Sequence, residues 1–201
     1  MYFFRLYNIT DDEVVTASSS NPSLVTEGAQ VTFSSASIPS ATVIEGITTD
    51  IATTPTSVPF GSVAIDAEVE GAQRLTIDTN GTEGYQVFVY GRQDLVSAQG
   101  DSINEVAASN TTPAAWSTGC SGSADGCFGY HTGDDTLSGG STRFAPNDTY
   151  AALETTLREV AYSGTPAVSE TVDIVYKVQV GDQQPAGQYE SQIVYIIVPT
   201  F

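Results

Sequence analysis

The chain has 201 residues, of which 24 are acidic and six are basic, so its formal net charge is −18 at pH 7. Nucleic acid and anionic membrane surfaces are excluded as main partners, because proteins bind both through clusters of Lys and Arg. A single histidine, His131, is too few for most histidine-based catalysis and for multi-histidine metal sites. The acidity fits either a secreted protein kept soluble by its charge or adaptation to high salt.

An apolar ribbon opens the chain, and a polar segment over residues 10–22 follows it. A terminal strand on a polar linker is what strand donation requires, in which one copy completes the sheet of the next. The alternative is that the ribbon forms the first strand of its own sheet. We expect residues 1–22 to be a strand arm with its linker and residues 23–201 to be one β-sandwich domain. The candidate donor residues are Tyr2, Phe3, Phe4, Leu6, Tyr7 and Ile9.

Strand patterns dominate up to residue 90. Short strands are expected at 31–33 and 42–47, and residues 62–70 alternate apolar and acidic side chains as a half-buried strand does. Segments 73–79 and 85–90 flank Asn80-Gly81, a dipeptide that accepts positive φ at both positions and therefore predicts a hairpin.

Residues 92–149 are rich in turn residues and read as loops, with a long glycine-rich excursion over 119–145. Cys120 and Cys127 are separated by six mostly small residues, which predicts a small disulfide loop and a location outside the cytoplasm. Aspartates in this excursion are candidate calcium ligands, and its aromatic residues are candidates for stacking on a glycan or a protein partner. The calcium candidates are Asp125, Asp134 and Asp135, and the aromatic candidates are Trp116, Phe128 and Tyr130.

The last fifty residues carry the clearest pattern. Residues 150–161 predict a short helix or an irregular strand. Segments 171–180 and 188–198 alternate strongly and are joined by a turn-rich connection, which predicts a second hairpin. The final strand is apolar on both faces, so we expect it to be buried on both sides. Together these segments predict an all-β, antiparallel sandwich of roughly seven to ten strands.

Two stretches resemble secreted bacterial β-sandwich surface proteins of the pilin-like, spore-coat-U-like and WxL types. They are Val58-Pro-Phe-Gly-Ser-Val63, followed by the 73–90 segment, and Gln184-Pro-Ala-Gly-Gln-Tyr189, leading into the final apolar strand. The resemblance spans roughly residues 58–201 and implies an immunoglobulin-like or pilin-like sandwich, export, and a structural or adhesive role. Trp116 is followed by Ser-Thr rather than by the x-Leu of a WxL motif, so wall binding through that motif is not implied.

These observations predict a structural subunit of an extracellular filament or surface layer, which polymerises with copies of itself through its N-terminal strand. The alternative is a monomeric cell-surface adhesin, or a glycan- or protein-binding module, that uses the 116–140 loop on a partner cell or surface. No serine lies in a G-x-S-x-G elbow, so we do not expect an enzyme. No cofactor is expected apart from possible calcium. No stretch approaches 18 apolar residues, so no transmembrane segment is expected.

Overall fold

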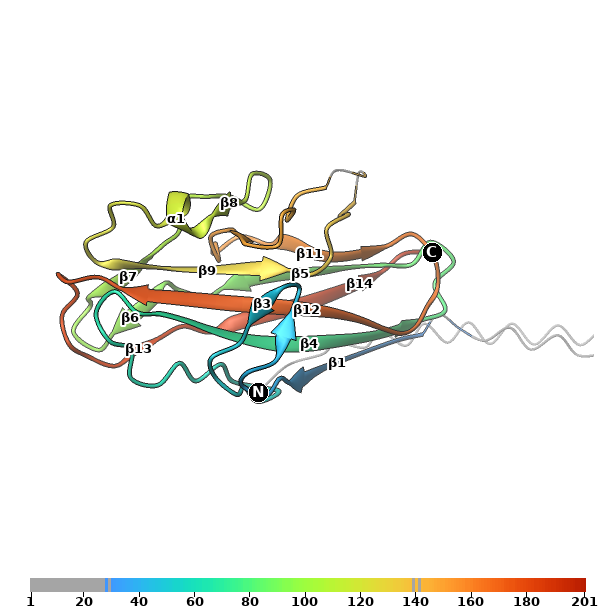
Figure 1. The fold of residues 1–201 in the computed structure, drawn as a ribbon. Coiled ribbons are helices and arrows are strands. Elements are labelled where there is room, and N and C mark those ends of the chain that lie inside the picture. Colours follow the sequence, from blue (N-terminus) through green and yellow to red (C-terminus); the bar gives the residue numbers. More distant parts are fainter. Residues whose placement is uncertain (1–27, 29, 139, 141) are drawn as a thin grey trace, which may run out of the picture.

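The structure is a computed structural model that describes residue 28, residues 30–138, residue 140 and residues 142–201 (Figure 1). Within these ranges the chain forms fourteen strands and a single helical turn. The elements are β1 (Val31–Ser37), β2 (Val43–Ile44), β3 (Ile47–Thr48), β4 (Glu68–Thr79), β5 (Tyr85–Gly91), β6 (Leu95–Ser97), β7 (Ser102–Glu105), β8 (Ala114–Ala115), α1 (Trp116–Gly119), β9 (Gly126–Thr132), β10 (Thr149–Tyr150), β11 (Arg158–Ser163), β12 (Ala167–Val180), β13 (Tyr189–Glu190) and β14 (Ile193–Pro199).

Two sheets enclose the main core. The larger has seven strands in the order β1-β4-β12-β9-β7-β6-β13, and the smaller has the order β11-β5-β14. Two-stranded pairs, β2-β3 and β8-β10, lie outside them. All pairings between named strands are antiparallel except β7 with β9, which is parallel. The sheets form a curled half-barrel (Figure 1). The expected all-β, antiparallel class is therefore confirmed.

The main core follows the alternation of β12. Val172, Ile174, Tyr176 and Val178 belong to the core cluster, and Ile174 and Tyr176 are fully buried. Side chains from β5 and β11 in the smaller sheet pack in the same cluster. Each fully buried aliphatic or aromatic side chain stabilises the fold by roughly 1.5–3 kcal/mol relative to an exposed one, so this row is a major source of stability.

Both predicted hairpins are wrong, although the strands themselves are present. β4 pairs with β1 and β12, whereas β5 pairs with β11 and β14, so the chain crosses from one sheet to the other at residues 80–84. The connection from β12 through β13 to β14 crosses in the same way. The turn residues still bend the chain: the Gly84 N–H donates to the Gly81 carbonyl at 3.0 Å. Strands distant in sequence occupy both edges of β4, which excludes β5 from pairing with it.

The expected 119–145 loop excursion is corrected as well, because it contains β9, a fully buried strand beside β12. The glycines of β9 allow close packing rather than a loop. A Cβ on Gly129 would lie 3.0 Å from the Ala151 carbonyl oxygen, and Gly126 has φ +90° and faces the Gln179 carbonyl. Glycine inside a strand marks such close approach of backbones.

Three further expectations are adjusted. Residues 62–67 do not belong to a long strand, since β4 begins at Glu68 and Ile65 is 61% exposed. Of the two alternatives for residues 150–161, the irregular strand is confirmed and the helix is wrong, because the segment contains parts of β10 and β11 and the pairing of β11 shifts register between Glu159 and Ala161. The outer face of β14 is not covered, because Ile196 and Val198 are 38% and 42% exposed.

A second, smaller core lies on the opposite face of the seven-stranded sheet. It is centred on Ala72 of β4 and Val175 of β12, and β2, β3, α1 and β10 cover it. Trp116 of α1 meets Tyr150 of β10 edge-on, with ring centroids 5.2 Å apart. The central strands are thus buried on both faces. No helix in the described ranges is both long enough and apolar enough to cross a membrane.

The one lysine of the chain lies inside this second core. Lys177 Nζ is 2.8 Å from Glu68 Oε2 and 2.9 Å from Glu70 Oε1, and its residue is 6% exposed. The ammonium also lies over the rings of Trp116 and Tyr150, about 5 Å from each centroid. Burial lowers the pKa of Lys177, but hydrogen bonds to the two glutamates and their charges outweigh burial and raise it overall.

We expect Lys177→Met to lower the free energy of unfolding by about 2–4 kcal/mol, because it leaves Glu70 partly buried without its counter-charge. Urea denaturation of the full chain measures this loss. The matched control is Arg74→Met, which removes a more exposed ion pair with Asp173 and should cost less than about 1 kcal/mol. Equal losses of unfolding free energy in the two variants would contradict the conclusion that the buried ion pairs of Lys177 stabilise the fold more than the exposed Arg74–Asp173 pair does.

Glu105 lies in the parallel pairing of β7 with β9, where the charged form of its carboxyl group is disfavoured. The pKa of Glu105 is raised from 4.5 to about 7, mainly by burial and further by the charges of Asp94 and Glu154. The unfolded chain releases this proton near pH 4.5 and the folded chain only near pH 7. The free energy of unfolding therefore falls as the pH rises through this window.

We expect Glu105→Gln to be about 1–2 kcal/mol more stable than the wild type above pH 7, after allowance for solvent screening, and similar to it below pH 4.5. Denaturation curves at both pH values provide the measurement. Glu83→Gln, at an exposed position, should change stability by less than about 0.5 kcal/mol. If Glu105→Gln changes the free energy of unfolding equally at both pH values, ionisation of the Glu105 carboxyl group is not the cause of the change.

Candidate functional site

An open groove of about 1210 Å³ is the candidate site in the described part of the chain. One wall is the irregular segment 55–65 together with Phe33 of β1, and the other is the segment 184–195. Leu95, Ile103, Phe128 and Val178, which are buried residues of the main core, form the floor. The volume exceeds the roughly 300–1,000 Å³ typical of small-ligand pockets.

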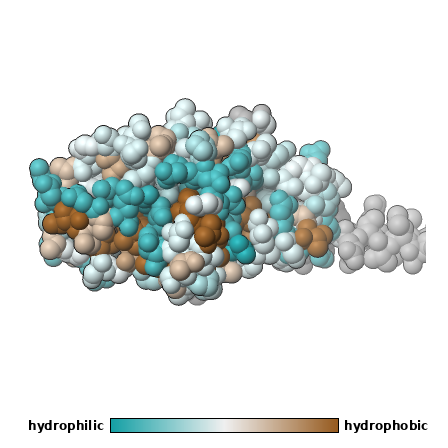
Figure 2. Space-filling model, viewed as in Figure 1, coloured by the Kyte–Doolittle hydropathy of each residue, from teal (hydrophilic) through white to brown (hydrophobic). Residues whose placement is uncertain are grey.

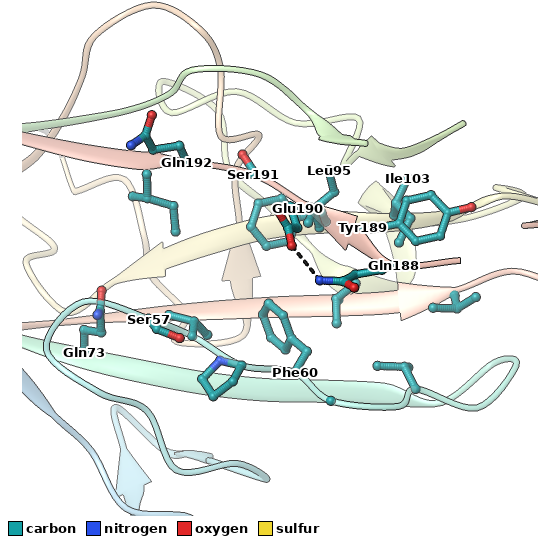
Figure 3. A pocket seen from close by; sticks show the side chains of 18 of the residues that line it. Ser57, Phe60, Gln73, Leu95, Ile103, Gln188, Tyr189, Glu190, Ser191 and Gln192 are labelled. Carbon is teal, nitrogen blue, oxygen red and sulfur yellow. Dashed lines mark hydrogen bonds between the residues drawn. The ribbon is translucent and has the colours of Figure 1, made fainter. Parts of the chain in front are cut away.

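Aromatic side chains shape the groove from both walls. Phe60 meets Phe128 of the floor edge-on, with centroids 6.2 Å apart, and Figure 3 shows Phe60 pointing into the space from its wall. Phe33 and Tyr195 bring β1 and β14 together, with centroids 6.1 Å apart. The Tyr195 hydroxyl also hydrogen-bonds that of Tyr176 beneath it. Ser35 Oγ, which lines the groove, is buried and has no hydrogen-bond partner in the described structure.

The two strands beside the groove end their respective sheets. β1 is the terminal strand of the larger sheet and β14 of the smaller one, so each is paired along one edge by the described strands. Just before and just after β14, backbone hydrogen bonds run toward the β5 side. The Arg92 N–H donates to the Gln192 carbonyl, and the Thr200 N–H donates to the Gly84 carbonyl. In an antiparallel strand, the backbone N–H and C=O groups of successive residues point to alternate edges. The backbone groups of Ile193 and Ile197 therefore point to the edge of β14 away from β5. Pro199 falls in that same row, where a missing N–H is tolerated.

The groove is almost free of charge on a strongly acidic molecule. Among the described residues that line it, Glu190 is the one with a charged side chain. Figure 3 shows Glu190 with Gln188, whose Nε2 donates to Glu190 Oε1 at 2.6 Å, projecting from the 184–195 wall toward the wall that carries Phe60. The described salt bridges do not include Glu190, which is exposed.

Most of the basic side chains in the described ranges are paired within the molecule. Arg74 binds Asp173, Arg143 lies 3.7 Å from Glu159, Arg158 binds Glu154, and Lys177 is held as described above. The surface therefore retains the excess of carboxylates, and Figure 2 shows a largely hydrophilic face with separate apolar patches. An apolar, nearly neutral groove is the exception to this surface.

The aromatic residues expected to stack on a glycan are core residues instead. Trp116 and Phe128 are each 3% exposed and Tyr130 is fully buried. Trp116 belongs to the second core, where its Nε1 donates to Gln179 Oε1 at 3.0 Å, and Tyr130 receives a hydrogen bond from Asn110. Their positions in α1 and β9 correct the expectation of an exposed aromatic loop.

The predicted calcium aspartates serve backbone and side-chain groups. Asp134 accepts hydrogen bonds from the N–H groups of Tyr162 and Thr136, and burial raises its pKa. Asp125 accepts from Asn104 Nδ2 at 3.4 Å. The described part of the chain contains no cluster of three His, Cys, Asp or Glu residues, Asp135 included, that could hold a metal ion.

His131 is also inside the fold rather than in a loop. It is fully buried in β9, its Nδ1 lies 2.8 Å from the Thr149 carbonyl oxygen, and its Nε2 has no partner in the described ranges. Burial lowers the pKa of His131. The rings of Phe144 and Tyr150 enclose it.

The predicted disulfide is confirmed: Cys120 and Cys127 are bonded, with their Cα atoms 5.6 Å apart. It ties α1 to β9 at the margin of the second core. The candidate donor residues, from Tyr2 to Ile9, lie outside the described residues.

Sequence reasoning did not identify the groove as a site. Its signals were present, since residues 55–65 place Val58, Phe60 and Val63 among prolines and glycine, an apolar composition in a segment without regular structure. The alternation of apolar and acidic residues over 62–70 predicted a strand there, so the segment was not recognised as the wall of a groove. No protein-family model, no curated protein and no solved structure matches the chain. The groove is therefore interpreted from its own geometry.

Proposed function

We propose that this protein is a structural subunit of an extracellular filament or surface layer. In this proposal the half-barrel is an incomplete, pilin-like sandwich, and residues 2–9 of a neighbouring copy complete it by lying in the groove between segments 55–65 and 184–195, beside β1 and β14. The observation that carries the proposal is the apolar groove bordered by two terminal strands. An exposed groove of this kind on a free monomer would favour aggregation, which a specific occupant prevents.

The lengths and chemistry of groove and ribbon support this occupant. β1 and β14 each have seven residues, and residues 2–9 form an eight-residue ribbon, about 26 Å long when extended. The ribbon is apolar apart from Arg5 and Asn8, as the groove is nearly uncharged. Backbone bonds to a sheet edge would give affinity, and alternate side chains in the groove would give specificity.

The connection to β1 favours donation to another copy. About twenty residues separate Ile9 from Val31, and they span up to roughly 65 Å when extended. That reach permits either the chain's own groove or a neighbour's. Connections within compact domains are usually about 4–6 residues, however, so a polar segment of this length suits a tether between subunits better than an internal loop.

The alternative of an adhesin that binds through the 116–140 loop is less favoured. Its aromatic candidates are buried, and no other aromatic cluster of the described loop replaces them.

Deletion of residues 1–10 should abolish assembly without unfolding the domain, because it removes the donated strand alone. Electron microscopy and light scattering of the purified full chain, 21.1 kDa per copy, should show fibres or large particles, and the deleted chain should be a monomer slightly lighter than that. A synthetic peptide of residues 1–10 should bind the deleted chain. A full-length chain that stays monomeric would refute self-assembly.

The groove itself is tested by Phe60→Glu, which places a carboxylate where the apolar strand would lie. We expect assembly to fall by at least about ten-fold, since an uncompensated charge at an interface costs more than about 1.4 kcal/mol. Val168→Glu is the matched control, because Val168 is an apolar residue 87% exposed and outside the groove. Similar losses in both variants, or unchanged assembly by Phe60→Glu, would argue against the groove as acceptor.

A further inference from the structure

The groove and the N-terminal ribbon each contain one charged residue, and the two charges are opposite. Glu190 is the charged residue that lines the described groove, and Arg5 is the charged residue of the segment 1–10. This is notable in a chain with 24 acidic and six basic residues, four of whose basic residues already have partners inside the domain. Arg5 is thus a basic residue that the ion pairs of the described domain do not account for.

We infer that Arg5 of one copy pairs with Glu190 of the next, and that this ion pair fixes the register and facing of the donated strand. The inference rests on the proposed function and specifies its interface. The partner is therefore a second copy of this chain, recognised by an apolar strand with a single positive charge near its centre.

The facing of the strand follows from alternation. Side chains at even and odd positions of a strand lie on opposite faces. Arginine keeps its head group in water or against a carboxylate, so the odd row that contains Arg5 faces the rim of the groove. The even row then enters the groove, with Tyr2, Phe4 and Leu6 over the apolar floor.

Glu190 is placed to receive such a cation. It is exposed, has no described salt-bridge partner, and projects from one wall toward the other beside Gln188 (Figure 3). A one-residue slip of the strand would move Arg5 to the opposite face and its apolar neighbours out of the groove. A slip of two residues would separate Arg5 from Glu190 by roughly 7 Å. The pair therefore selects one register among those that the apolar side chains alone would tolerate.

The repulsion between copies makes this pair more important. Each copy carries −18, and at about 0.1 M ionic strength charges interact over about 10 Å. A complementary contact at the docking point offsets this repulsion locally and accelerates association more than it strengthens the final complex.

A charge swap tests the inference on the full chain, with light scattering reporting the initial rate of assembly. Arg5→Glu and Glu190→Arg each place like charges at the contact, and each should slow assembly by on the order of ten-fold at about 0.1 M salt. The double variant Arg5→Glu/Glu190→Arg should return to within about two-fold of the wild type, because its charges are again opposite.

Mixing the two single variants distinguishes neighbours from self-contact. Each strand of one variant is complementary to the groove of the other, so an equimolar mixture should assemble as alternating copies although neither variant assembles well alone. Asp182→Arg makes the same change in net charge as Glu190→Arg, at an exposed position outside the groove, and should not slow assembly. At about 1 M salt, where screening reduces the range to about 3 Å, the differences should shrink.

The experiments distinguish failure of the Arg5–Glu190 pair from failure of strand donation itself. If deletion of residues 1–10 abolishes assembly but the single swaps assemble as the wild type does, strand donation stands and the Arg5–Glu190 pair is refuted. If the double variant recovers and the mixture does not, the strand occupies its own groove and the partner is refuted. If the deleted chain assembles normally, the proposed function itself is wrong.

Discussion

The structure depends on the position of β12 between β4 and β9. β12 pairs with β4 from Ala167 to Gln179 and with β9 from Ile174 to Val180, so both of its edges are filled from Ile174 to Gln179. Because β4 also receives β1 on its other edge, the segment that follows β4 finds no free edge beside it, and the segment that follows β12 pairs in the larger sheet only briefly, as β13 beside β6. They cross to the smaller sheet, where they become β5 and β14. The half-barrel, its second sheet and the terminal positions of β1 and β14 all follow from this arrangement.

The groove is a direct consequence of that crossing. The walls are formed by 55–65, which precedes β4, and by 184–195, which follows β12, and the core strands provide the floor between them. The partly buried apolar side chains of the walls, among them Val58, Phe60 and Val63, are costly to leave in contact with water. The proposed strand from a second copy would cover them and extend the sheets at the same time. Residues 58–63 and 184–189 form parts of these two walls.

Charge controls how such a molecule meets its neighbours. The described basic side chains are mostly used inside the fold, most clearly Lys177 between Glu68 and Glu70 beneath two aromatic rings. Copies therefore repel one another except where the surface is neutral or carries an opposite charge. The groove is such a place, and salt should change the rate of any self-association there more than its geometry.

The sequence by itself determined the local features: the all-β class, the alternation of β12 and β14, the bends at Asn80-Gly81 and at residues 181–187, and the Cys120–Cys127 disulfide. Each of these depends on neighbours a few residues apart, through side-chain period, turn conformation or a short covalent loop. The tertiary structure decided which strands pair, and so turned two apparent hairpins into sheet-to-sheet crossings. It also placed β9 in the centre, where Gly126 and Gly129 permit backbone contact that in sequence is typical of a loop. Burial of Trp116, Phe128 and Tyr130 and the opening of the groove depend on residues far apart in the chain, and no local pattern contains that information.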